Sequence, residues 1–502
     1  MRQHIKRLGT ETAIYGVGTV AGRFLSFILV PFYTNVLDPA EYGIVAYLYS
    51  LIAFANIFYW YGMEAAYFRF ATETSAGPSA GTGRSPDSMP AKAFFSTPFI
   101  SMVGSSVAFS LLVYLFRETI SSWIGVPPGH DTLITYTAGI LLLDAVAVIP
   151  FAFLRLARMA KLFTWVKFLN ILTNVLLNIV LLLKYHAGVE GIFLSGLIAS
   201  GVTLLMLIPV IAGEFRPSFD GKMLGAMLRF CLPTVPAGLA LMALQVIDRP
   251  ILRALTDDAT VGIYQANYRL GIFMMIAVSV YDYAWRPFFF SHASDPDAKK
   301  TFARVMTYVV LALSFIFFAF TFFIPDIVRL EIGGHNFIHP KYWDGLGIVP
   351  VVMMGYLFLG ISTNLSAGIY IRKKTRYLPV VNVTGAVANV VLNYTLIPKF
   401  GIAGAAWATL LSYLLMAVFL YMVVEKIYPI EYEKDRLWKI FDVAALFGVA
   451  YHFLPIEGWA WALPVKIVLL AGYPVTLYAL GVFRIGEIAS VKSLFRSAGN
   501  SR

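Results

Sequence analysis

Fourteen apolar segments run the length of the chain, and each is long enough, or nearly so, to cross a membrane as a helix. They lie at about 12–37, 41–68, 93–117, 132–154, 163–183, 189–213, 230–254, 260–290, 302–324, 345–371, 377–397, 401–424, 437–454 and 461–483. A hydrocarbon layer of about 30 Å takes about 20 residues of helix. Only 13% of the 502 residues are charged, against about 25% in globular domains. The sequence therefore predicts an all-α polytopic membrane protein with about 14 transmembrane helices.

The basic residues indicate an orientation for these helices. With the N-terminus placed in the cytoplasm, 28 of the 39 Lys and Arg fall on the cytoplasmic side and seven on the opposite side. The other four, which lie within spans, are Arg23, Arg249, Arg269 and Arg286. Cytoplasmic loops carry an excess of positive charge, so both termini are predicted to be cytoplasmic. The basic stretch Met1–Gly9 leads into a span without a cleavage site, unlike a signal peptide.

An internal repeat divides the predicted spans. The motif of Asn174, Asn178 and Gly188-Val-Glu-Gly191 recurs as Asn389, Asn393 and Gly401-Ile-Ala-Gly404, and Leu37–Gly43 resembles Leu255–Gly262. Six spans separate the copies, and an even number keeps them parallel. We therefore expect two six-helix lobes, 1–215 and 216–425, followed by an extra helix pair and cytoplasmic tail at 426–502. Transporters commonly place their passage between such lobes.

Motifs for enzymatic chemistry are absent from the sequence. It contains no Gly-x-x-x-x-Gly-Lys-Ser/Thr phosphate loop, no His-Glu-x-x-His and no Gly-x-Ser-x-Gly. His335 and His339 lack supporting metal ligands, and Cys231 is the single cysteine. A polytopic glycosyltransferase or polymerase needs a sizeable outer loop, but the longest, about 325–344, has little room for a domain. We expect a transporter that needs no metal, cofactor or nucleic acid.

Charged and amide side chains at membrane depth are the candidate functional residues. A charge at the centre of a spanning helix costs about 2.5–3.5 kcal/mol, so such residues usually face water or a partner. Arginine cannot lower this cost by losing its proton. Gln245 and Arg249 are four residues apart, as are Gln265 and Arg269, which puts each pair on one helical face. The predicted cavity-lining set is Arg23, Asn56, Glu64, Gln245, Asp248, Arg249, Gln265 and Arg269.

Other polar residues have a plainer interpretation. Asp282 with Arg286, and Glu64 with Arg69, can pair locally near the membrane interface and simply fasten helices. Alternatively, Arg69, Asp282 and Arg286 form gating ion pairs at the cytoplasmic mouth. Asp144 can neutralise a neighbouring arginine, and the repeated asparagines are expected to form hydrogen bonds between helices.

A cationic passage suits an anionic cargo. Guanidinium groups bind phosphate through two parallel hydrogen bonds, so several of them facing a shared interior favour a head group such as a diphosphate or an acidic sugar. Outward movement of such a head group is aided by an inside-negative potential, by roughly 2.3 kcal/mol per charge per 100 mV.

Several short motifs resemble a known superfamily. They are Asp248-Arg249 followed by Val261-Gly-Ile-Tyr264, the stretch from Gly62-Met-Glu64 to Arg69-Phe70, and Trp285-Arg-Pro-Phe-Phe289. With fourteen spans and the six-plus-six repeat, these look like the multidrug/oligosaccharidyl-lipid/polysaccharide (MOP) exporter superfamily. Within it the chain is most similar to the Wzx-type flippases of polysaccharide repeat units.

This resemblance implies a function and a location. It implies alternating access that carries undecaprenyl-diphosphate-linked oligosaccharide, such as a repeat unit of lipopolysaccharide O-antigen, across the cell inner membrane. Spans 1, 2, 7 and 8 would line the cavity. The implied partners are the lipid-linked oligosaccharide, membrane lipids and polysaccharide assembly proteins. Two alternatives share the fold: a flippase for the lipid-linked peptidoglycan precursor and a cation-coupled multidrug antiporter, whose cavity should be rich in acids.

Overall fold

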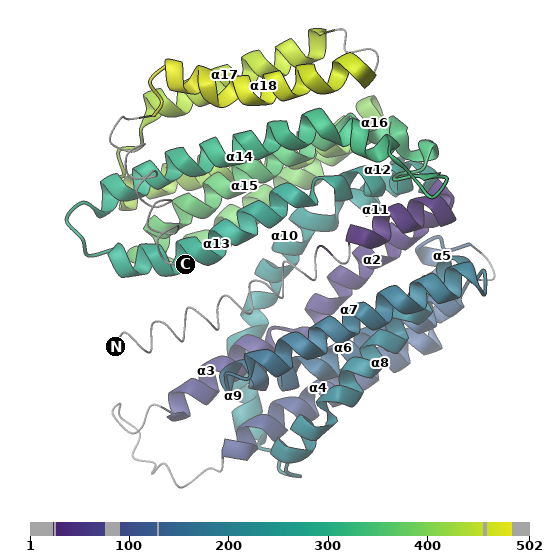
Figure 1. The fold of residues 1–502 in the computed structure, drawn as a ribbon. Coiled ribbons are helices and arrows are strands. Elements are labelled where there is room, and N and C mark those ends of the chain that lie inside the picture. Colours follow the sequence, from purple (N-terminus) through teal and green to yellow (C-terminus); the bar gives the residue numbers. More distant parts are fainter. Residues whose placement is uncertain (1–23, 25–26, 76–90, 128–129, 455–458, 484–502) are drawn as a thin grey trace, which may run out of the picture. The chain divides into compact units, whose positions relative to one another are not determined.

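A computed structural model describes residue 24 and residues 27–75, 91–127, 130–454 and 459–483 (Figure 1). Arg23, most of the first predicted span, residues 76–90 and the C-terminal tail lie outside the described residues. The described residues form seventeen α-helices, two short 3-10 helices and one β-hairpin. The hairpin pairs β1 (Glu331–Ile332) with β2 (His335–Asn336) in antiparallel register, so the all-α prediction needs this small amendment.

The helices have the following bounds. They are α2 Pro39–Trp60, α3 Met63–Ser75, α4 Ala91–Leu115, α5 Arg117–Trp123, α6 Thr132–Leu156, α7 Ala160–Leu183, α8 Gly188–Glu214, α9 Gly221–Cys231, η2 Leu232–Thr234, α10 Val235–Val246, α11 Asp248–Leu255, α12 Asp258–Leu270, α13 Ile272–His292, α14 Ala298–Arg329, η3 Pro340–Gly345, α15 Ile348–Ile371, α16 Tyr377–Ile427, α17 Lys434–Phe453 and α18 Trp459–Ala479. Phe27–Val36 is a shorter apolar helix that precedes α2.

Ten helices within the described ranges are long and apolar enough to cross a membrane, so the chain is a multi-pass membrane protein. One of them, the 51-residue α16, holds two predicted spans, because Gly401 within it has non-helical backbone angles (φ 54°, ψ −131°). These ten helices do not include α12 and α13, which cover the predicted eighth span, or α17.

The predicted seventh and eighth spans run through several shorter helical segments, and residues 221–246 together form one membrane-length helix. Between 221 and 255 the chain passes through α9, η2, α10 and α11, with a turn at Ile247. Pro233 in η2 and Pro236 in the first turn of α10 lack the amide hydrogen that a continuous helix would use. Gly271 separates α12 from α13.

The chain forms two compact units. Unit 1 contains residues 1–269, 338–348 and 382–412, and unit 2 contains residues 270–337, 349–381 and 413–502. The first part of α16 therefore belongs to unit 1 and its last part to unit 2.

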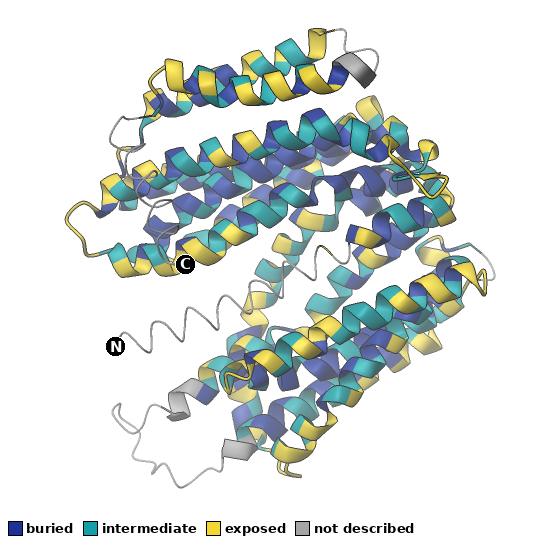
Figure 2. Ribbon diagram, viewed as in Figure 1, coloured by how far each residue is buried: buried dark blue, intermediate teal, exposed yellow. Residues whose placement is uncertain are grey.

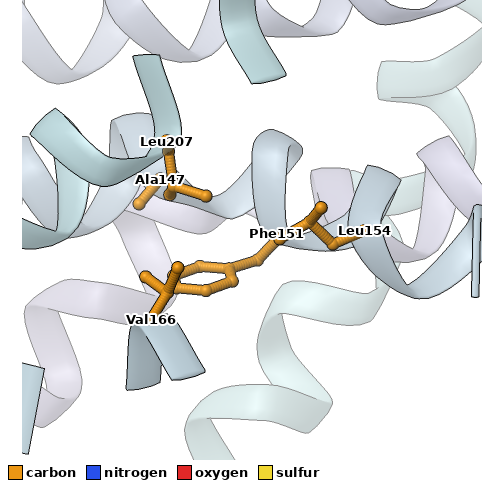
Figure 3. Close-up of a cluster of buried hydrophobic side chains, with 5 residues drawn as sticks. All are labelled: Ala147, Phe151, Leu154, Val166 and Leu207. Carbon is orange, nitrogen blue, oxygen red and sulfur yellow. The ribbon is translucent and has the colours of Figure 1, made fainter. Parts of the chain in front are cut away.

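In unit 1, α6 lies against α4, α7 and α8. Phe151, Leu154, Val166 and Leu207 form a buried cluster where α6, α7 and α8 meet (Figure 3). Lipid tails are as apolar as these side chains, so the cluster stabilises the unit through close van der Waals packing rather than through removal from water. Figure 2 shows exposed residues along the outward face of α7, as a lipid-facing helix requires.

In unit 2, polar contacts attach α17 and α18 to α14. The Tyr473 hydroxyl donates to Ser314 Oγ at 2.7 Å, and Thr307 Oγ1 donates to Glu433 Oε2 at 2.8 Å. Lys466 Nζ donates to Asp326 Oδ2 at 2.6 Å. Three separate points of contact along α14 fix the last helix pair to this unit.

The two copies of the asparagine motif have the same conformation, and both lie in unit 1. Asn178 Nδ2 donates to the Asn174 carbonyl oxygen at 2.7 Å, and Asn393 Nδ2 donates to the Asn389 carbonyl oxygen at 2.8 Å. These bonds lie within one helix, whereas the Tyr33 hydroxyl, which donates to Asn178 Oδ1 at 2.9 Å, makes the expected bond between helices.

The glycines that follow these asparagines also match. Gly188 and Gly401 have φ angles of +51° and +54°. Residues that carry a side chain rarely adopt positive φ angles, so glycine is favoured at the same position in both copies of the motif.

Candidate functional site

The candidate site is centred on α11 and α12 in unit 1. Asp248, Arg249 and Gln265 are 3%, 5% and 8% exposed, so two charges and an amide are withdrawn from solvent together. Ile247, between α10 and α11, has helical backbone angles (φ −67°, ψ −22°), and its amide donates to the Ala243 carbonyl oxygen at 3.1 Å, so the helical path continues into Asp248. The Asp248 carboxylate accepts a hydrogen bond from the Arg249 amide at 3.0 Å.

Hydrogen bonds join the two helices through Arg249. Its Nη1 donates to Asp248 Oδ1 and to the Gln245 carbonyl oxygen, both at 2.6 Å, and its Nε donates to Gln265 Oε1 at 3.1 Å. The two stripes that start at Gln245 and Gln265 therefore do meet, as the four-residue spacing predicts.

Aromatic rings complete the surroundings of Arg249. The guanidinium carbon lies 4.2 Å from the Tyr268 ring centroid, and the Tyr264 hydroxyl donates to Asp248 Oδ2 at 2.5 Å. The buried charge is thus held by a carboxylate, an amide and a π face. Arg249 has a fixed orientation, and Asp248 compensates its charge.

Arg269 is placed differently. It lies one turn after Gln265 on α12 and is partly exposed. Among the residues that the structure describes, no carboxylate is within ion-pair distance of it. Arg269 is therefore the uncompensated cation of the described part of this site.

The residues predicted from α2 and α3 are also in unit 1. Asn56 lies on α2, and its Oδ1 is buried without a hydrogen-bond partner among the described residues. Glu64, in the first turn of α3, forms an ion pair with Arg155 of α6. The local Glu64–Arg69 pair expected from the sequence is therefore replaced by a contact across 91 positions of the chain. The Arg69 guanidinium lies 4.5 Å from the Phe230 ring centroid.

The predicted ion pair between Asp282 and Arg286 forms within α13. Arg286 Nε donates to Asp282 Oδ1 at 2.8 Å, at the four-residue spacing. Both residues belong to unit 2. Their side chains are 56% and 31% exposed, so this pair contributes little to stability by itself.

Sequence reasoning assigned no site role to a second charged group in unit 1. Asp144 accepts a hydrogen bond from Ser200 Oγ at 2.7 Å, and Lys167 Nζ lies 4.2 Å from the Phe151 ring centroid. The expected pairing of Asp144 with an arginine stays a prediction. Lys167 is one of the 28 Lys and Arg that the sequence-based count puts on the cytoplasmic side, and its place inside an apolar run is the signal that could identify it.

Arg253 was also overlooked. It donates to the carbonyl oxygens of Ile124 and Gly125 at 2.6 and 2.7 Å and to Asp258 Oδ1 at 2.5 Å. Its guanidinium carbon lies 4.1 Å from the Tyr47 ring centroid. One arginine therefore joins α2, α11, α12 and the end of α5.

The chemistry that these groups offer is anion binding. Within the described ranges, no group of three or more His, Cys, Asp or Glu is arranged to hold a metal ion. A fixed guanidinium and a second, partly exposed one suit phosphate oxygens.

Unit 2 contributes an apolar cavity of about 600 Å³. It is lined by residues of α14, α15, α16 and α17, including Val310, Phe358, Leu414 and Phe441, with Lys434 and Trp438 also in its wall.

Comparisons with known proteins identify a family. A family model described as "Polysaccharide biosynthesis protein" matches residues 8–293. Among curated proteins, none matches the sequence.

Solved structures with the same fold are transporters. The lipid II flippase MurJ in an inward closed conformation aligns with a TM-score of 0.71 at 16% identity, over 93% of this chain and 98% of that one. An inward-facing multidrug resistance MATE transporter of the MOP superfamily aligns with a TM-score of 0.60 at 13% identity, over 80% and 94%. The Vibrio cholerae MATE transporter VcmN in its bent form aligns with a TM-score of 0.54 at 14% identity, over 84% and 96%.

Proposed function

The chain belongs to the polysaccharide biosynthesis protein family of the MOP exporter superfamily, a family of non-enzymatic transporters, and we propose that its cargo is undecaprenyl-diphosphate-linked oligosaccharide. The protein moves this repeat unit of a surface polysaccharide, such as O-antigen, across the cell inner membrane by alternating access. Polysaccharide assembly proteins act before and after it.

The observation that carries this proposal is the unequal pair of guanidinium groups on α11 and α12. Asp248 and Gln265 hold Arg249 in one orientation, while Arg269 has no carboxylate at ion-pair distance within the described residues. A diphosphate can supply the missing negative charge. We assign Arg269 to direct contact with the cargo and Arg249 to orienting the site. Arg23, Asn56, Glu64, Gln245, Asp248 and Gln265 complete the proposed lining.

A lipid-linked cargo also needs an apolar surface. The cavity of about 600 Å³ in unit 2 can hold part of a polyprenyl chain, because almost all of its named lining side chains are apolar. An acyl chain of a membrane lipid would fit the same chemistry, so the head group, not the tail, distinguishes the cargo.

The transport cycle that we propose uses the internal repeat. Residues 1–215 and 216–425 form two six-span lobes that alternate in access, and 426–502 add a helix pair and a cytoplasmic tail, which gives fourteen spans with both termini in the cytoplasm. The matched Asn178–Asn174 and Asn393–Asn389 bonds support the internal repeat. Arg69, Asp282 and Arg286 are placed at the cytoplasmic mouth.

Export of surface glycan tests the proposed site. In cells that lack the native protein, Arg269→Ala should reduce export about 10- to 100-fold, which corresponds to the loss of one charge-assisted hydrogen bond. Arg269→Lys should retain part of the activity, since lysine keeps the charge but not the paired geometry. The control is Arg229→Ala, because Arg229 is exposed near the end of α9. Normal export by correctly inserted Arg269→Ala protein would contradict the assignment.

Two other outcomes would replace the proposed cargo. Lysis on depletion, with the surface polymer still displayed, would indicate the lipid-linked peptidoglycan precursor. Efflux of ethidium by the reconstituted protein, without transfer of undecaprenyl-diphosphate-linked oligosaccharide between leaflets, would indicate a drug antiporter.

A further inference from the structure

One short segment belongs to a different unit from the helices on either side of it. Ile338–Ile348, which includes η3, packs in unit 1, whereas α14 before it and nearly all of α15 after it are in unit 2. The segment is therefore held by contacts in unit 1, while the chain on both sides of it belongs to unit 2.

The segment is anchored by a buried tyrosine. Tyr342 is 0% exposed, and its hydroxyl donates to the Leu37 carbonyl oxygen at 3.0 Å. Asn267 Nδ2 donates to the Tyr342 carbonyl oxygen at 2.8 Å, and the Tyr342 ring meets the Tyr42 ring edge-on at 6.1 Å. The tyrosine thus bridges Leu37, two residues before α2, and Asn267 in the C-terminal half of α12.

The edge of the contact is polar and weak. Lys341 Nζ donates to Asp38 Oδ1 at 2.6 Å, but both side chains are more than half exposed, at 56% and 66%. Exposed ion pairs contribute about 0–1 kcal/mol. This edge can therefore separate at little cost, while the buried Tyr342 carries the specificity of the docking.

Beneath the segment, α2 and α12 touch through their backbones. A Cβ atom on Gly43 would collide with the Asp258 carbonyl oxygen, and one on Gly262 would collide with the Pro39 carbonyl oxygen. The two glycines end the matched motifs Leu37–Gly43 and Leu255–Gly262, so the two copies make equivalent contacts with each other. No cargo can pass between two helices that are in backbone contact.

From this geometry we infer that Ile338–Ile348 is a plug that closes one end of unit 1 over the Gly43–Gly262 contact, and that it must undock before cargo leaves by that end. The inference rests on the proposed function, and the proposed topology makes this end the outer one. Because the plug is continuous with α14 and α15 of unit 2, any movement of that unit pulls on it directly.

Reversible crosslinking tests the plug. In a Cys231→Ala background, Asp38→Cys and Lys341→Cys are combined and joined by a short bis-methanethiosulfonate reagent. Crosslinking should reduce glycan export at least tenfold, and a reductant should restore it. The two single-cysteine variants, treated with the same reagent, should keep exporting. Fully crosslinked protein that exports at the rate of the reduced protein would overturn the inference.

A second measurement separates the plug from the identity of the cargo. Ile338 is 1% exposed, so Ile338→Cys reacts with a membrane-impermeant maleimide only when the segment undocks. Tyr342→Phe removes the hydrogen bond to Leu37 and should speed this labelling about 2- to 10-fold. If no lipid-linked oligosaccharide is exported by any variant, the proposed function fails. The labelling rate of Ile338→Cys still tests whether the segment undocks. Equal labelling rates with tyrosine and phenylalanine would count against it.

Discussion

At the scale of single residues, Asp248 and Arg249 form the most demanding contact of the site. Both are almost fully buried, so each charge is tolerable only in the presence of the other. Removing one member of such a pair costs about 3–5 kcal/mol, mostly because the remaining charge is left uncompensated. The Tyr264 hydroxyl donates a further hydrogen bond to Asp248 Oδ2, and Gln265 Oε1 accepts one from Arg249 Nε.

The first prediction concerns Asp248→Asn. The substitution keeps the shape of the side chain but removes its charge, so it should destabilise the protein by about 3–5 kcal/mol. Thermal unfolding of the purified protein in detergent measures this as a lower midpoint. Asp297→Asn is the control, since that carboxylate is 75% exposed and should change stability by at most about 0.5 kcal/mol. An unchanged midpoint for Asp248→Asn would contradict the buried pair.

At the scale of elements, hydrophobic runs predicted where helices lie but not where they break. The predicted spans at 377–397 and 401–424 anticipate the irregular Gly401 inside α16. The runs that include Pro233 and Gly271 looked continuous, because a proline or a glycine within an apolar stretch does not lower its hydropathy. Whether such a residue ends a helix depends on neighbours that can satisfy the freed backbone groups.

The site itself was predictable only in part, for a similar reason. The four-residue spacing of Gln245 and Arg249 put both on one face, and Arg249 does contact Gln265. The partner of Glu64 could not be read in the same way. Arg155 is 91 residues away and meets Glu64 only because α3 packs on α6. Local spacing predicts a face of a helix, whereas tertiary packing selects the partner.

The second prediction concerns Gly401→Ala. With φ at 54° and ψ at −131°, this residue occupies a region that is almost restricted to glycine, and strain of this kind costs about 1–3 kcal/mol. The unfolding midpoint should fall accordingly. Gly225→Ala in α9 is a matched control, because no atom lies within 4 Å of the added Cβ and alanine favours helix by up to about 1 kcal/mol. Equal unfolding midpoints for Gly401→Ala and Gly225→Ala would show that a side chain at position 401 does not strain the backbone.

At the scale of the whole molecule, helix length sets how the chain crosses the membrane. The 51 residues of α16 would extend about 75 Å as one straight helix, more than twice the hydrocarbon thickness of about 30 Å. In the fourteen-span topology that we propose, the irregular residue Gly401 lies at a membrane surface, with one span on each side of it. Dividing α16 in this way raises the ten long helices to eleven, and the other three proposed spans are the first one, which lies mostly outside the described residues, the run of α12 and α13, and α17.

The last prediction follows from that division. Lys373 and Lys399 are exposed residues near the two ends of the first part of α16, so cysteines at these positions should face opposite sides of the membrane. In a Cys231→Ala background, an impermeant maleimide should label Lys399→Cys on intact cells and Lys373→Cys only in inverted vesicles. Lys300→Cys, beside the start of α14, should behave like Lys373→Cys. If both ends of this segment react from one side, the segment does not span the membrane, and the parity argument that places both termini in the cytoplasm fails with it.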